Sequence, residues 1–267
     1  MTLPETETLL LDEQAPFLHV TLNRPEARNA MSLAMVDELM AVFDAVEDRA
    51  DIRALVLRGT GGHFCAGGDI KDMAGARQKA AQGDDQAYYS LNRRFGTMIT
   101  RANRLPQAVV AVLEGAIMGG GFGLACVTDI AIAAEDARFA LPETSLGVIP
   151  AQIAPFVVQR IGLTGARRLA LTGARFDGRE ALRQGIVHEV TPTAEIDQRL
   201  QETLDQIRHC APHANRNTKA LMLRVGEDPL EELLDDAARQ FAESVAGPEG
   251  TEGTTAFMQK RLPEWAQ

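Results

Sequence analysis

The feature that most constrains the fold of this 267-residue chain is a glycine-rich stretch, residues 115–123. It follows the apolar, strand-like run at residues 108–113 and leads into small residues with a helical pattern. Glycines at such a junction permit positive φ angles and close approach of backbone to another group. The helix that begins there has unpaired N–H groups, which suit an oxyanion or a phosphate. Close packing of a buried helix against a strand would need the same glycines, so this stretch alone leaves both interpretations open.

A second junction of the same kind spans residues 59–73. A short apolar strand at 53–58 leads through small residues into the polar start of a helix at Asp69. Asp is a common N-cap residue, because its carboxylate accepts hydrogen bonds from the first free N–H groups of a helix. On this pattern alone we favour capping over catalysis for Asp69.

The rest of the chain divides into a strand-containing part and a helical part. Further strands are predicted at residues 8–11, 17–22, 129–133, 138–143 and 186–190. Helices are predicted after the N-cap candidate Ser32 and at 88–103, 150–160, 164–171 and 177–184, with a mobile surface segment at 78–85. Pairs of strands that close into a helix recur, which predicts an α/β fold of repeated β-β-α units. Strands vanish near residue 195, so we expect a core of residues 1–195 and a helical region of residues 196–267.

Composition and charge exclude several classes of protein. The net charge of −10 argues against a general nucleic-acid binder, although a local pocket can still hold an anion. The cysteines Cys65, Cys126 and Cys210 are scattered, as is typical of a reducing compartment. No apolar run has the length of a membrane span, and the N-terminus lacks a signal-peptide pattern. We therefore expect a cytoplasmic protein without a membrane or nucleic-acid partner.

Several common catalytic motifs are absent from the sequence. There is no GxxxxGK[ST] loop, and residues 119–124 do not complete GxGxxG. No serine lies in a GxSxG motif. His209 and His213 have the spacing of a helical metal pair, but Pro212 lies between them, so no metal site is expected. Carboxylates remain the best candidates for acid and base groups.

Four stretches in a fixed order carry a resemblance to a known family: residues 23–30 (NRPEARNA), 64–70 (FCAGGDI), 115–129 and 139–150, with the tail 255–261 (TAFMQKR). They resemble the enoyl-CoA hydratase/isomerase family, also called the crotonase family, over nearly the full length. The resemblance implies a spiral of β-β-α units, a C-terminal helical trimerisation region, and a homotrimer or a dimer of trimers. It also implies an acyl-CoA thioester as substrate, with no cofactor beyond the coenzyme A of that substrate.

The resemblance assigns catalytic roles to a few residues. It places an oxyanion hole at the backbone N–H groups of Ala66 and Gly120, and a proton-transferring carboxylate at Glu143. Two fixed donors stabilise the negative charge of a thioester enolate, and loss of one typically costs about 3–4 kcal/mol in the barrier. The second carboxylate of the family falls on Gly123. We therefore expect a pocket that has lost one base and gained room.

The resemblance further implies contacts with the coenzyme A and pantetheine parts of the substrate. They fall on Arg28, Ala30, Gly68, Asp69, Ile70, Phe257 and Lys260. Arg28 is equally compatible with a solvated surface charge that contacts no phosphate. An acidic protein that binds several phosphates needs a local cation, however, which favours the phosphate contact. The tail residues Phe257 and Lys260 would reach this region in some cases from a neighbouring subunit.

The reaction is less constrained than the family. A single carboxylate fits a double-bond isomerase, in which one group shuttles a proton. Residues 147–158 depart from the common family pattern and resemble bacterial hydratases that act on 3-substituted glutaconyl-CoA, in leucine or acyclic-terpene breakdown. Space at Gly123 would suit a methyl or isohexenyl branch, and we choose this hydratase reaction. A non-catalytic member that binds acyl-CoA or RNA is the third alternative.

Overall fold

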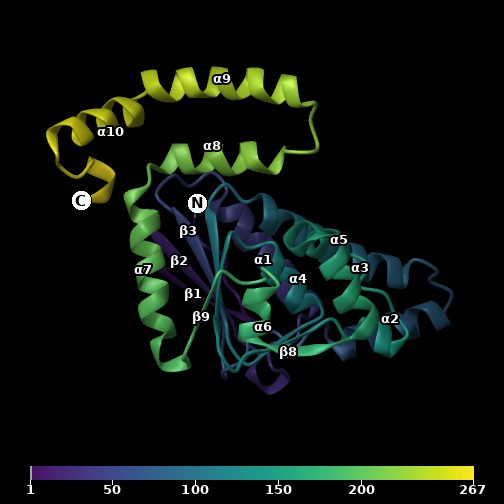
Figure 1. Cartoon of the computed structure of the whole chain (residues 1–267). Helices are drawn as coiled ribbons and strands as arrows, with labels where there is room; N and C mark the ends of the chain where they lie inside the picture. Colours follow the sequence, from purple (N-terminus) through teal and green to yellow (C-terminus); the bar gives the residue numbers. More distant parts are fainter. Residues whose placement is uncertain (1) are drawn as a thin grey trace.

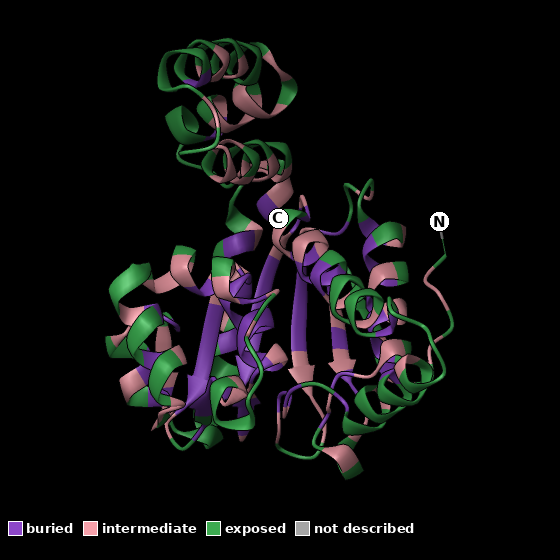
Figure 2. Cartoon of the chain, turned by 90° about the vertical axis from the view of Figure 1, so that its right-hand side faces the viewer, coloured by how far each residue is buried: buried purple, intermediate pink, exposed green. Residues whose placement is uncertain are grey.

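Two sheets form the frame of the computed structural model, which describes residues 2–267. The larger sheet has six strands in the order β1-β2-β3-β4-β6-β9. Their bounds are β1 Leu9–Gln14, β2 Phe17–Leu22, β3 Ala54–Gly59, β4 Ala108–Leu113, β6 Ile130–Ala134 and β9 Glu189–Thr191. All neighbours pair in parallel except β1 and β2. The central strands are almost fully buried, as expected for a parallel sheet covered by helices (Figure 2).

The chain passes repeatedly from the larger sheet to a smaller one and then into a helix. β4 is followed by β5 (Ala116–Met118) and α4 (Gly120–Cys126), and β6 by β7 (Arg138–Ala140) and later α5 (Ala154–Thr172). β5 and β7 pair in parallel, and Cys65 forms an isolated parallel bridge with Ile117. β8 (Arg175–Asp177) completes the smaller sheet. The predicted succession of β-β-α units is therefore confirmed.

The remaining helices cover the sheets or follow them. They are α1 Leu33–Val46, α2 Ile70–Ala81, α3 Ala87–Arg104, α6 Gly178–Arg183, α7 Ile196–His209, α8 Pro212–Leu223, α9 Leu230–Ala246 and α10 Pro248–Gln259, with short 3-10 turns η1 Pro25–Ala27, η2 Glu143–Leu146, η3 Thr193–Glu195 and η4 Glu264–Ala266. Ser32 caps α1 by accepting from the Met35 N–H, as predicted. None of the helices in residues 2–267 is both long and apolar enough to span a bilayer.

Several boundaries differ from the sequence prediction. The strand expected at 138–143 ends at Ala140, and the last strand is shifted to Glu189–Thr191. The segment 78–85 is not wholly irregular, because α2 continues to Ala81. The helices predicted at 150–160 and 164–171 form one element, α5, that is broken at Gly162, where φ is 73°. Positive φ interrupts the helical path there, which explains the two separate periodic patterns.

The chain is helical from Ile196 onward, but α7 belongs to the body of the sheet. Its residues Ile196, Leu200, Leu204 and Ile207 are buried in the main core. Lys219 connects α8 to the rest of the molecule: its Nζ donates to Asp129 Oδ2 at 2.6 Å and to the Gln107 carbonyl at 3.0 Å. α9 and α10 extend beyond α8, away from the sheet (Figure 1).

Candidate active site

The two glycine-rich junctions lie side by side. The Cys65 N–H donates to the Ala116 carbonyl at 2.9 Å, and the Met118 N–H donates to the Cys65 carbonyl at 3.0 Å. Gly67 and Gly119 have φ angles of 108° and 48°, so both occupy conformations that favour glycine. A Cβ atom at Gly119 would lie 3.8 Å from the Gly67 Cα. The first turns of α2 and α4 are thus brought to one place.

The free backbone donors at this place are not the pair predicted from the sequence. The Ala66 N–H already donates to the Arg28 carbonyl at 3.0 Å, so Ala66 has no free donor to offer a thioester oxygen. The N–H groups of Gly68 and Gly120 have no acceptor among residues 2–267. A Cβ atom at Gly68 would meet nothing within 4 Å, so open space lies beside it. The free N–H expected at Ala66 is therefore not present, and Gly68, two residues further along the loop, offers a free N–H instead.

Glu143 opens the 3-10 turn η2 and reaches the α4 junction. A Cβ atom at Gly119 would lie 2.8 Å from Glu143 Oε1. The other oxygen, Oε2, is buried and has no hydrogen-bond partner. Burial raises the pKa of this carboxyl group, with a backbone hydrogen bond opposing the rise. A carboxylate with a raised pKa and a free oxygen beside two free amides is suited to proton transfer.

Gly123 does not open additional space. A Cβ atom there would lie 2.1 Å from Ile153 Cγ2 and 3.2 Å from Ile99 Cδ1. Ile153 therefore fills the volume that a larger residue at 123 would need, which corrects the predicted gain of room. The ring of Phe95 lies 3.2 Å from the Cβ position of Gly120. The wall of the site around α4 is thus apolar, and no second carboxylate lies at position 123.

Asp69 supports the loop instead of facing a substrate. Its Oδ1 accepts from the Lys71 N–H at 2.7 Å, which confirms the predicted N-cap of α2. Its Oδ2 forms an ion pair with Arg24 at 2.6 Å, and the Arg24 guanidinium also donates to the Ala30 carbonyl at 2.6 Å. Both carboxylate oxygens of this buried residue are therefore occupied. The predicted substrate contact through the Asp69 side chain is not supported.

The remaining predicted contacts fall into two groups. Arg28 and Ile70 have exposed side chains, with Ile70 81% exposed, and Ala30 lies on the loop of Arg28, which meets the Gly68 loop through the bridge between Met31 and Gly68. Phe257, 84% exposed, lies in α10, and Lys260 follows it. Figure 1 shows α10 far from α2 and α4. A single chain therefore does not bring these two tail residues to the site.

Sequence reasoning missed Asn29, which holds the loop together. It is fully buried, accepts from the Arg24 N–H at 2.8 Å, and donates to the carbonyls of Thr60 and His63 at 2.9 and 2.7 Å. Its φ of 55° is uncommon for a residue other than glycine, and Asn tolerates it better than most. The signal in the sequence that could have indicated this role is an Asn in a loop that also contains Pro.

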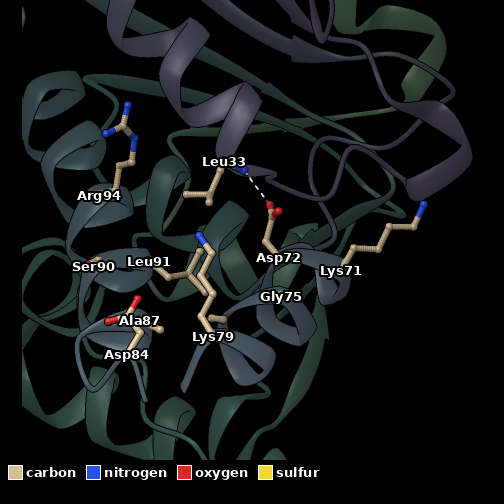
Figure 3. A pocket seen from close by; sticks show the side chains of 11 residues that line it. Leu33, Lys71, Asp72, Gly75, Lys79, Asp84, Ala87, Ser90, Leu91 and Arg94 are labelled. Carbon is tan, nitrogen blue, oxygen red and sulfur yellow. Dashed lines mark hydrogen bonds between the residues drawn. The ribbon is translucent and has the colours of Figure 1, made fainter. Parts of the chain in front are cut away.

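A separate cavity of about 230 Å³ lies between α2, α3 and the start of α1 (Figure 3). Lys71, Lys79 and Arg94 line it together with Asp72 and Asp84. The pocket residues of α2 occupy one face of that helix, and the exposed Ile70 and Met73 occupy another. This cavity is therefore distinct from the space beside Gly68. No group of three or more potential metal ligands gathers within residues 2–267.

Comparisons with known proteins place the chain in a family. The family model described as enoyl-CoA hydratase/isomerase matches residues 12–267, so the chain belongs to that family, the crotonase family. Among solved structures, Pseudomonas aeruginosa AtuE is 65% identical, with a TM-score of 0.95, covering 98% of this chain and 100% of that one.

The names of the relatives include more than one reaction. A protein of Mycobacterium bovis named "Probable enoyl-CoA hydratase" is 32% identical, covering 97% of this chain and 98% of the relative. The peroxisomal Delta(3,5)-Delta(2,4)-dienoyl-CoA isomerase of Arabidopsis thaliana is 30% identical over the full length of both chains. The protein is accordingly an enzyme of the crotonase family, a hydratase or an isomerase of acyl-CoA thioesters.

Proposed function

We propose that this enzyme adds water to the double bond of a branched, 3-substituted glutaconyl-CoA, such as methylglutaconyl-CoA or isohexenylglutaconyl-CoA. The observation that carries the proposal is the buried, unpartnered Oε2 of Glu143 beside two free backbone N–H groups. This combination supplies one mobile proton site and one oxyanion site. Both are what addition of water to a conjugated thioester needs.

The free N–H groups of Gly68 and Gly120 bind the thioester oxygen. As hydroxide character develops at C3, electrons move through the double bond to C2 and onto this oxygen. The positive end of α4 and the two donors stabilise the resulting enolate. Because the wall beside them contains Phe95, Ile99 and Ile153, these interactions act in a water-poor environment where they are stronger.

Glu143 serves as both base and acid in this scheme. Its carboxylate takes a proton from the attacking water while the water oxygen bonds to C3. The same proton, now on Glu143, is returned to C2 of the enolate, which yields the 3-hydroxyacyl-CoA and regenerates the carboxylate. One carboxylate is sufficient for this sequence, so Gly123 is compatible with hydration.

Coenzyme A is held by the loops around the oxyanion donors. Arg28 supplies a cation for phosphate, and Ala30, Gly68 and Ile70 line the path of the pantetheine. Phe257 and Lys260 act from a neighbouring subunit of a homotrimer or dimer of trimers. The enzyme works in the cytoplasm and needs no cofactor other than the substrate's own coenzyme A.

The test is turnover of defined thioesters by the purified enzyme. Incubation with 3-methylglutaconyl-CoA should remove the conjugated enoyl absorbance and give the 3-hydroxyacyl-CoA by mass spectrometry. The Glu143→Gln variant should be slower by at least 10²-fold, because it can neither accept nor return the proton. An unchanged rate in that variant would remove Glu143 from the mechanism.

The isomerase is the second candidate, and the single carboxylate favours it. Conversion of a β,γ-enoyl-CoA to its conjugated isomer, with no incorporation of ¹⁸O from labelled water, would assign that reaction. Tight acyl-CoA binding without conversion of either thioester would instead indicate a non-catalytic member of the family.

A further inference from the structure

Arg93 of α3 is a cation that no carboxylate of the described residues neutralises. On the same helix, Arg94 pairs with Asp37, and Arg101 pairs with Asp44 and Glu47. Arg93 forms no ion pair within residues 2–267; its Nη1 instead donates to Gln152 Oε1 at 2.7 Å. An amide fixes the direction of a guanidinium without cancelling its charge. Several of its N–H donors therefore stay available to an anion.

Gln152 is itself held in place. Its Nε2 donates to Asn92 Oδ1 at 2.9 Å, so both ends of its amide are bonded to α3. A Cβ atom at Gly96 would lie 1.9 Å from Gln152 Oε1 and 2.5 Å from Arg93 Nη1. Glycine at 96 is thus required for both groups to lie against α3. Arg93 and Asn92 are exposed and Gln152 is half-buried, so this polar cluster lies at the surface, where an anion can reach it.

The cluster adjoins the wall of the active site through sequence neighbours on both sides. Phe95, beside Gly96, contacts Gly120, which carries one of the free amides. Ile153, beside Gln152, contacts Gly123 on the next part of α4. Glu143 lies against Gly119, at the start of the same turn. The polar cluster therefore borders the apolar residues that pack against α4.

We infer that Arg93, oriented by Gln152, binds the terminal carboxylate of a dicarboxylic acyl chain and so selects substrate. This inference rests on the proposed function and names the residue behind its substrate class. A glutaconyl chain carries its carboxylate at C5, two carbons beyond the site of water addition. An arginine held by an amide can offer such a carboxylate two parallel N–H donors, a geometry that gives specificity as well as affinity.

The inference is tested by binding of unreactive, saturated thioesters. Glutaryl-CoA and pentanoyl-CoA have equal chain length and differ in the terminal carboxylate. By calorimetry the wild type should bind glutaryl-CoA more tightly, by about 10- to 100-fold, as expected for a charge-assisted hydrogen-bonded pair. Arg93→Gln should abolish this preference while it leaves pentanoyl-CoA affinity unchanged. Gly96→Ala should weaken the preference as well, since it displaces Arg93 and Gln152 together.

Arg104→Gln is the matched control. It removes the same charge from α3, at a residue that likewise forms no ion pair within residues 2–267, about three turns further along the helix. It should keep the preference for glutaryl-CoA. A preference that survives in Arg93→Gln, or a wild type that binds both thioesters equally, would overturn the inference. Failure of the proposed hydration appears separately, as absent turnover of 3-methylglutaconyl-CoA by a wild type that still prefers glutaryl-CoA.

Discussion

The side chain of Glu143 carries a buried oxygen without a partner, and the same burial raises its pKa above the ordinary value of 4.5. In the unfolded chain the carboxyl group titrates near that ordinary value. Between the two pKa values the folded protein holds a proton that the unfolded chain has lost. Stability from this group is therefore present below about pH 4.5 and is lost as pH rises through the folded pKa.

Replacement of Glu143 by Gln should make the protein more stable at neutral pH. The variant has no charge to bury, so its advantage in melting temperature should be largest above the folded pKa and should shrink toward pH 4.5. Thermal unfolding from pH 4 to pH 8 measures this difference. A wild type that melts above the variant at pH 8 would show that the Glu143 carboxylate is stabilised in the free enzyme.

The open Cβ position of Gly68 permits a test of its backbone donor by substitution. Gly68 is not among the glycines with positive φ, and its Cβ position is open. Gly68→Ala should keep activity within about threefold, whereas Gly68→Pro, which lacks an N–H, should lower kcat/KM by about 10²- to 10³-fold. Melting temperatures of the two variants control for damage to the loop. Equal activity of the two variants would show that the Gly68 N–H is not the oxyanion donor.

Contact between α4 and the start of α5 decides what position 123 can be. Gly123→Ala places a methyl group against Ile153 and should destabilise the fold by about 1–3 kcal/mol. Ile153→Ala should cost about 2–5 kcal/mol alone. The double variant should lose less than the sum, with a coupling of about 1 kcal/mol, because each change relieves the other. Urea unfolding gives all four corners of this cycle.

Gly75→Ala on α2 is the control for the glycine replacement. Nothing lies within 4 Å of its Cβ position, so the change should be neutral or stabilise by about 0.5–1 kcal/mol through helix propensity. Additive costs at 123 and 153 would contradict the contact described between these helices.

Glycine patterns predicted the strands and helices around the site better than they predicted which N–H groups are free and where space is left. The two junctions were visible because strand-like runs lead into glycines, and Glu143 stood in a familiar motif. A free N–H was expected at Ala66 and not at Gly68. The hydrogen bond from Ala66 to the distant Arg28 carbonyl is a tertiary property, so the sequence pattern could not show that this N–H is occupied. Likewise, room at Gly123 depends on Ile153, which is 30 positions away in sequence. The strand β5 was hidden in the glycine run since it has only three residues.

At the scale of the molecule, periodicity predicted that the C-terminal region is helical. It did not predict that α7 packs on the sheet while α9 and α10 extend away from it. Buried apolar positions of α7 fix it to the sheet, whereas α8 is fixed by a partly buried ion pair, Lys219–Asp129, that no pattern reveals. Lys219 has its pKa lowered by burial, opposed by Asp129. Beyond α8, α9 buries only Leu233 and α10 only Ala256 within the described residues of a single chain.

The face of α9 formed by Leu230, Leu234, Phe241 and Val245 is exposed, with Phe241 71% accessible. Their spacing places them along one side of the helix, and exposed apolar stripes of this kind mark contacts between proteins. We expect light scattering to give a mass of three or six times 28.9 kDa. Phe241→Asp should reduce this mass and weaken coenzyme A binding together, because Phe257 and Lys260 would no longer reach a neighbour's site. Ala242→Asp, about 100° further round α9, adds the same charge and should change neither. A wild type that is monomeric with full coenzyme A affinity would refute both the assembly and the role of the tail.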